Sequence, residues 1–94
     1  MSAKARREFR LIGSGRFTWD TASTNAGAQA TTTVNVPGAV VGDAVLVTPD
    51  APQSGFLYDG RVTAAATVTL RAVNASGSTA DPSSTTFSVL VLRP

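Results

Sequence analysis

The chain has 94 residues and a formal net charge of +2, and it contains neither cysteine nor histidine. The length suits one domain. The composition excludes disulfides and the usual zinc and copper ligands, so we expect no metal and no cofactor. It also lacks the histidine base and the cysteine nucleophile of common hydrolases, and we expect no enzyme activity.

Charge divides the sequence into two parts. Five of the eight basic residues lie in residues 1–16, whereas the five aspartates all follow Phe17. Residues 1–27 are therefore predicted to form a basic N-terminal arm and linker. Gly13-Ser14-Gly15 is interpreted as a flexible joint within this arm, with a short strand at most over residues 16–20. We expect the domain of residues 28–94 to fold without the arm.

No secretory signal is recognised at the N-terminus, because no apolar segment follows the basic run at residues 3–7. No stretch of the chain approaches the length of a membrane span. We therefore expect synthesis in a cytoplasm and no membrane partner.

The first half of the domain shows two strand patterns. Residues 28–36 alternate between two faces and are rich in β-branched residues, which is typical of a strand. Pro37-Gly38 ends this segment. Residues 44–48 are apolar on both faces, and such a run indicates a strand covered on both sides, by a second sheet or by a neighbouring subunit.

The second half contains three further strand patterns. Residues 56–64 and 67–74 are predicted to form a hairpin about Ala64-Ala65-Ala66, with a bulge at Asp59-Gly60. The last strand, residues 85–93, alternates Phe87, Val89 and Val91 with a second row that also contains large apolar groups. Short strands separated by turns predict an all-β domain, either a small antiparallel β-sandwich or a jelly-roll-like barrel with an extended N-terminal arm.

A partner subunit is expected on grounds of size. A small domain buries a small share of its surface, and natural domains of this size add disulfides, a metal or oligomerisation. Of these, only oligomerisation is open to this composition. The residues predicted to form the core or the oligomer interface are Val45, Val47, Phe87, Leu90 and Leu92.

The aspartates are interpreted as turn residues rather than catalytic acids. Asp43, Asp50, Asp59 and Asp81 each adjoin a glycine or a proline, and aspartate favours turns through its own side chain. No glutamate lies beyond residue 8, and no pair of carboxylates suggests a glycosidase. Asn74-Ala75-Ser76 is a formal glycosylation sequon that we take as a chance match.

Four phrases of the sequence carry a family resemblance. They are Val36-Pro37-Gly38-Ala39, residues 42–49 (GDAVLVTP), residues 62–71 (VTAAATVTLR) with Asn74, and Asp81-Pro82 ahead of Thr86-Phe87-Ser88-Val89. Through them, residues 34–91 resemble a domain that recurs in fibre, spike and head-surface proteins of tailed bacteriophages, often as trimeric β-sandwiches. The matched residues form turns and strands, so they bear on the fold more than on the role.

The resemblance, together with the small size, implies a capsid decoration or cement protein on the outer surface of the virion. It implies a homotrimer as the oligomer and the major capsid protein as the partner. Attachment is expected through the arm, where apolar groups are interleaved with charges. The predicted capsid-binding residues are Arg6, Arg7, Phe9, Arg10, Leu11, Ile12 and Arg16.

Other interpretations stay open at this stage. The arm is equally explained as a solubilising tail, and Trp19 as an ordinary core residue of a first strand. A nucleic-acid contact is not expected, because the domain offers no basic face to continue it. The alternative function is a carbohydrate- or cell-surface-binding module, for which Phe56 and Tyr58 are the candidate aromatic residues, since they share one face of a strand.

Overall fold

The computed structural model describes residues 9–51 and 55–94, and these residues form β-strands joined by turns and loops, with no helix among them. The strands are β1 (Arg10–Trp19), β2 (Gln29–Asn35), β3 (Ala44–Pro49), β4 (Phe56–Ala64), β5 (Thr67–Asn74) and β6 (Thr85–Arg93). The predicted all-β class is confirmed.

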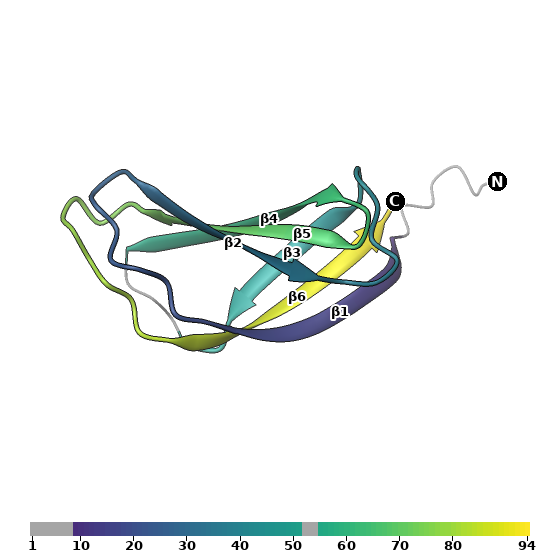
Figure 1. The fold of residues 1–94 in the computed structure, drawn as a ribbon, viewed down its shortest axis with the longest axis horizontal. Coiled ribbons are helices and arrows are strands. Elements are labelled where there is room, and N and C mark those ends of the chain that lie inside the picture. Colours follow the sequence, from purple (N-terminus) through teal and green to yellow (C-terminus); the bar gives the residue numbers. More distant parts are fainter. Residues whose placement is uncertain (1–8, 52–54) are drawn as a thin grey trace.

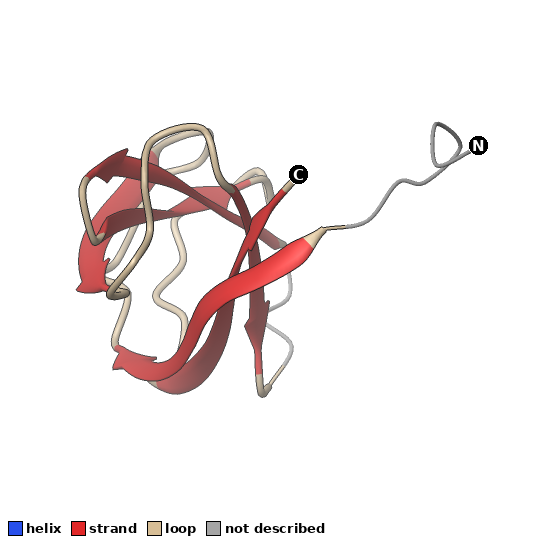
Figure 2. Ribbon diagram, turned by 90° about the vertical axis from the view of Figure 1, so that its right-hand side faces the viewer, coloured by secondary structure: helices blue, strands red, loops and turns tan. Residues whose placement is uncertain are grey.

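The strands form two three-stranded sheets that pack face to face. One sheet has the order β1-β6-β3 and the other the order β2-β5-β4, and Figure 1 shows them as two layers. All pairings within the sheets are antiparallel. In the view of Figure 2 the strands enclose a common interior. The domain is therefore a β-sandwich, one of the two architectures predicted from the sequence.

The domain begins earlier than the sequence suggested. Residues 10–19 are not part of a separate arm but form β1, which pairs with β6 over its length. Ile12, Phe17 and Trp19 pack against the core. The boundary between arm and domain thus lies before Arg10 and not after residue 27, and the domain should not fold without β1.

Gly13 and Gly15 are strand residues rather than a flexible joint. A Cβ atom at Gly13 would lie 2.8 Å from Cγ1 of Val36, and one at Gly15 would lie 2.6 Å from the ring of Phe17. Neighbouring side chains therefore occupy the space that a larger residue would need, which is one reason for glycine inside a strand. The register of the β1–β6 ladder also shifts between Leu11 and Gly13.

The core lies between the two sheets and is built from alternate strand residues. Along β2, half-buried residues alternate with exposed ones, as predicted. On β6, Phe87, Val89 and Val91 point inward and are at most 1% exposed. The buried centre of the core consists of Val36, Ala39, Val62, Val68, Leu70, Val89 and Val91.

A row of aromatic rings extends the core. The ring centroid of Phe87 lies 5.8 Å from that of Trp19 and 4.9 Å from that of Tyr58. Phe56 lies 6.3 Å from Tyr58 and is 9% exposed. Burial also raises the pKa of the Tyr58 hydroxyl. Phe56 and Tyr58 are thus packing residues, and the sugar-binding role suggested for them is not supported.

The hairpin of β4 and β5 is confirmed, with one change in detail. The two strands pair antiparallel about a turn at residues 65–66, where Ala66 adopts a positive φ of 59°. The irregularity in the ladder lies between Val62 and Ala64, not at Asp59-Gly60. Asp59 sits within the regular ladder opposite Arg71, so it is a strand residue and not a turn residue.

Asn74 joins the two long loops at one end of the sandwich. Its side-chain amide donates to the carbonyl oxygens of Thr24 and Ser78, both at 2.8 Å, and its Oδ1 accepts from the backbone N–H and the hydroxyl of Ser76. The side chain is fully buried. A buried amide needs such partners, so Asn74 is explained by structure, and its sequon is not accessible in the folded chain.

Candidate interaction surfaces

The outer face of the β1-β6-β3 sheet carries a cluster of apolar side chains. In one row across the sheet, Leu92 lies between Leu11 and Ala44; in the next, Leu90 lies between Ser14 and Leu46. We name the apolar members of these rows the leucine face: Leu11, Ala44, Leu46, Leu90 and Leu92. Leu11 is 57% exposed, Leu46 53% and Leu90 37%.

The leucine face is unusual for a surface because its members adjoin one another. Single exposed leucines are normal on soluble proteins, whereas contiguous apolar patches mark sites of interaction. β6 is the central strand of its sheet, and it carries large apolar groups on both sides: Val89 and Val91 inward, Leu90 and Leu92 outward. The strand therefore presents large apolar groups both to the core and to the outer surface.

The opposite end of the same outer face is polar, and its charges are already paired. Arg16 forms an ion pair with Asp50 and donates to the Ser88 hydroxyl at 2.8 Å. Arg16 and Ser88 occupy one row of the ladder. The side chains of Thr18 and Thr86 approach within 3.2 Å in the following row. The outer face is thus apolar at one end and polar at the other, where its charged groups are paired with each other.

A second ion pair clamps the loop between β2 and β3 to the end of β6. Arg93 donates to both carboxylate oxygens of Asp43 at 2.8 Å, and the N–H of Val40 donates to the same carboxylate at 3.0 Å. The hydrogen bonds from Arg93 and Val40 lower the pKa of Asp43 to about 2. This clamp holds the chain next to Ala44 and Leu92, at the apolar end of the leucine face.

The predicted capsid-binding residues do not form one surface. Arg6 and Arg7 lie outside the described residues. Phe9 and Arg10 are exposed, and Leu11 belongs to the leucine face. Ile12 instead packs against the core, and Arg16 is held by Asp50 and Ser88.

The residues predicted as core or interface also separate into two groups. Val45 and Val47 pack against the core, and Phe87 is buried within the sandwich. Leu90 and Leu92 point the other way and lie on the leucine face. Alternation along β6 placed these two sets on opposite faces, but it did not tell which face points inward.

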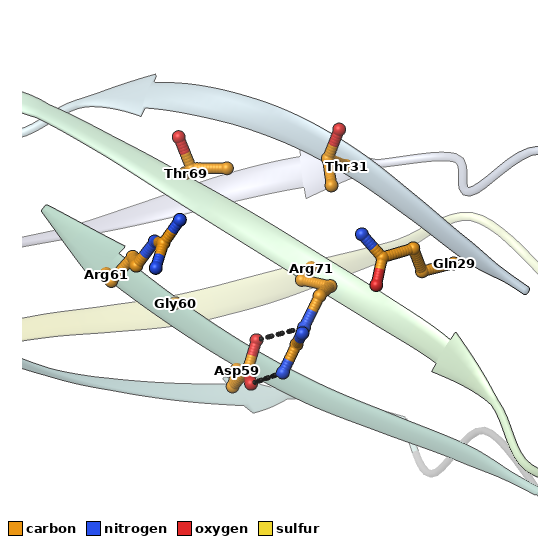
Figure 3. A pocket seen from close by; sticks show the side chains of 7 residues that line it. All are labelled: Gln29, Thr31, Asp59, Gly60, Arg61, Thr69 and Arg71. Atoms are coloured by element: carbon orange, nitrogen blue, oxygen red, sulfur yellow. Dashed lines mark hydrogen bonds and ion pairs between the residues drawn. The ribbon is translucent and has the colours of Figure 1, made fainter. Parts of the chain in front are cut away.

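The outer face of the β2-β5-β4 sheet is mostly polar, with Leu57 and Val73 as an apolar pair at one end. Arg71 lies between Thr31 and Asp59 in one row, and Thr69 lies between Thr33 and Arg61 in the next. Here the sheet carries a hollow of about 350 Å³. Its lining residues, shown in Figure 3, are Gln29, Thr31, Asp59, Gly60, Arg61, Thr69 and Arg71.

Sequence reasoning missed this polar face because it interpreted Asp59 as a turn residue. In the structure, Arg71 donates from Nε to Oδ1 of Asp59 at 3.0 Å and from a terminal nitrogen to Oδ2 (Figure 3). These bonds raise the pKa of Arg71. The predicted hairpin alone did not give this pair, because counting back from the turn at residues 65–66 sets Asp59 opposite Ala72. The register shift between Val62 and Ala64 brings Asp59 opposite Arg71 instead.

No family model matches the chain, and neither the curated proteins nor the solved structures include a match. Among residues 9–51 and 55–94, no helix is long and apolar enough to cross a membrane. The same residues contain no group of three or more acidic, histidine or cysteine side chains placed to hold a metal ion.

Proposed function

We propose that the chain is a structural protein of a phage particle, a capsid decoration protein that acts as a homo-oligomer, with a trimer expected. The observation that carries the proposal is the leucine face, a contiguous apolar surface on a small β-sandwich. The phage context comes from the sequence resemblance over residues 34–91. The particle surface is the proposed location, after synthesis in the host cytoplasm.

A second copy of the chain is the proposed cover of the leucine face. Fully burying one leucine side chain stabilises a contact by roughly 1.5–3 kcal/mol, so several together offset the cost of association. The charged groups bordering the face, Arg16 with Asp50 and Arg93 with Asp43, are paired within the chain. These two pairs therefore present no net charge to a neighbouring copy. Three-fold positions on capsids favour three copies over two.

We assign attachment to the major capsid protein to the segment that precedes β1 and to the first residues of β1. Arg6, Arg7 and Arg10 supply positive charge, and Phe9 supplies an apolar side chain that is 58% exposed. Ile12 and Arg16 are left out, because both already have partners inside the domain. Charge steers such a contact, while apolar burial holds it when salt screens the charge. No nucleic acid is involved in this proposal.

Co-sedimentation with capsids assembled without this protein tests the proposal. The full chain should pellet with the capsids. A variant lacking residues 1–8 should stay folded, because β1 begins at Arg10, and should remain in the supernatant. Arg6→Ser with Arg7→Ser should weaken binding, whereas Arg61→Ser with Arg71→Ser removes the same charge from the polar face and should not. Full binding without residues 1–8 would contradict attachment through this segment.

A further inference from the structure

The hollow on the outer face of the β2-β5-β4 sheet has the features of a ligand site. It is formed by neighbouring rows of three antiparallel strands, so its side chains stand on rigid backbone rather than on loops. Its volume of about 350 Å³ lies at the lower end of the roughly 300–1,000 Å³ that is usual for small-ligand pockets. It lies on the sheet opposite the leucine face, so it stays accessible whether or not copies of the chain associate.

Several polar groups in the hollow have no partner among residues 9–51 and 55–94. The side chains of Gln29, Thr31 and Arg61 form no hydrogen bond or ion pair with any described residue. In Figure 3, Arg61 and Gln29 border the hollow from β4 and β2, on either side of β5. Together the three side chains present amide, hydroxyl and guanidinium donors in one place, with the amide and hydroxyl oxygens as acceptors.

The remaining charged groups of the hollow are held in a fixed arrangement. Asp59 binds Arg71 through both of its carboxylate oxygens, which fixes the plane of the guanidinium. The carboxylate keeps lone pairs that accept further hydrogen bonds from hydroxyl groups. Thr69 is engaged with Thr63, whose hydroxyl lies 2.9 Å away. Arg61 is therefore the one guanidinium of the lining that lacks a carboxylate partner among the described residues.

These groups favour one class of ligand. Two guanidinium groups and one carboxylate give the hollow a net charge of +1, which suits a ligand that places one negative charge within the hollow. The negative charge of Asp59 repels a chain of phosphates, whereas its carboxylate oxygens accept hydrogen bonds from hydroxyl groups. No aromatic side chain lines the hollow, so the stacking platform on which single-stranded nucleic acids depend is missing from it. A ligand with one carboxylate and several hydroxyl groups fits this chemistry.

We propose that this hollow binds a carboxylated sugar, such as a uronic acid residue of an acidic polysaccharide. Arg61 contacts the sugar carboxylate through two parallel hydrogen bonds, as guanidinium groups do. Asp59, Gln29 and Thr31 contact the ring hydroxyls. The site does not depend on the self-association or on the capsid attachment described above, because it uses neither the leucine face nor residues 1–11.

Nuclear magnetic resonance titration of the full chain with trigalacturonate tests the site. Saturable shifts are expected at backbone amides around Thr31, Arg61 and Arg71. Maltotriose, which is neutral, and inorganic phosphate, which lacks hydroxyl-bearing rings, should bind at least about tenfold more weakly, since each lacks one half of the recognised chemistry. Failure of trigalacturonate to give saturable shifts would overturn the proposal, and so would equal binding of maltotriose or of phosphate.

Two matched arginine variants separate a specific contact from general attraction. Arg61→Ala should weaken trigalacturonate binding by about tenfold or more, the usual cost of losing a charge-assisted hydrogen bond. Arg61→Lys should recover part of it, because lysine keeps the charge but not the planar pair of donors. Arg16→Ala gives the same net charge from the other sheet and should bind as the unchanged chain does. If Arg16→Ala weakened trigalacturonate binding as much as Arg61→Ala does, binding would depend on overall charge alone, and the proposed site would be overturned.

Discussion

The two sheets resemble each other on their inner faces and differ on their outer ones. Inward, both present valine and aromatic side chains to a shared core. Outward, the β1-β6-β3 sheet presents adjoining leucines, whereas the β2-β5-β4 sheet presents mostly threonine, arginine, aspartate and glutamine, with Leu57 and Val73 at one end. The central strands show the contrast directly, with Leu90 and Leu92 on β6 against Thr69 and Arg71 on β5.

The difference teaches that the outward leucines are not needed to make strands. Threonine is β-branched and favours strands as well as larger apolar residues do, without exposing apolar surface. Thr31, Thr33 and Thr69 serve that purpose on the polar face. Leucines at equivalent positions of the other sheet are therefore not explained by strand formation, and the proposed cover by another copy would account for them.

Two ion pairs differ in burial, Asp43–Arg93 beside the leucine face and Asp59–Arg71 on the polar face. The Asp43 carboxylate that holds Arg93 next to the leucine face is 3% exposed, whereas Asp59 and Arg71 on the polar face are 56% and 46% exposed. Exposed ion pairs contribute little to folding stability. The Asp43–Arg93 pair is thus a structural clamp, while the Asp59–Arg71 pair is available to arrange a surface.

Removing β1 should have the largest effect on stability, because the leucine-face sheet then loses one of its three strands. Deletion of residues 1–19 should abolish cooperative thermal unfolding, followed by circular dichroism. Burial of Phe17 and Trp19 is lost, at roughly 1.5–3 kcal/mol for each large apolar side chain, from a total of about 5–15 kcal/mol. Deletion of residues 1–8 is the control and should melt like the full chain. A cooperative transition without β1 would show that this strand is dispensable.

Placing lysines on each outer face tests whether the two surfaces differ in role. Leu46→Lys with Leu90→Lys alters a cross-strand pair of the leucine face, and Thr33→Lys with Thr69→Lys alters the matching pair of the polar face. Both doubles add the same charge to one edge and one central strand. Size-exclusion chromatography with light scattering should give a single-chain mass for the leucine double and an unchanged oligomer for the threonine double. Loss of association in both would remove the distinction between the faces.

The acid stability of the two ion pairs gives a smaller contrast. Asp43 has its pKa lowered from 3.8 to about 2, so its contribution to the free energy of unfolding is complete above about pH 4 and is lost as the pH falls toward 2. Asp43→Asn should destabilise the chain at neutral pH and flatten this decline in urea unfolding. Asp59→Asn should change the neutral-pH stability little and retain the decline. If the free energy of unfolding of Asp43→Asn fell as steeply with pH as that of the unchanged chain, groups other than Asp43 would cause the decline.

The strands with simple alternation were predictable from sequence, and those governed by distant contacts were not. β2, the β4–β5 hairpin and the bounds of β6 follow from local patterns. Gly13 and Gly15 looked like a joint because the local pattern does not show which side chains occupy the space beside them. Val36, which follows β2, lies beside Gly13, and the ring of Phe17 lies beside Gly15. Only the polar row of Ser14, Arg16 and Thr18 hinted at β1.

The surfaces were harder to predict than the strands. β6 is apolar on both sides, so its sequence alone does not say which row faces the core. The polar hollow requires β2, β4 and β5 to be aligned in register, which brings Thr31, Arg71 and Asp59 into one row. Register depends on the turn and on the bulge after Val62, and the bulge was expected elsewhere.

Sedimentation equilibrium of the unchanged full chain at micromolar concentration tests the central claim most directly. If the leucine face is covered by other copies, the protein should sediment with the mass of three chains of 9.6 kDa each. A mass of two chains would retain the leucine face as an interface and refute the trimer. A single-chain mass across the concentration range would contradict the account, because the leucine face would then be stable in water without a cover.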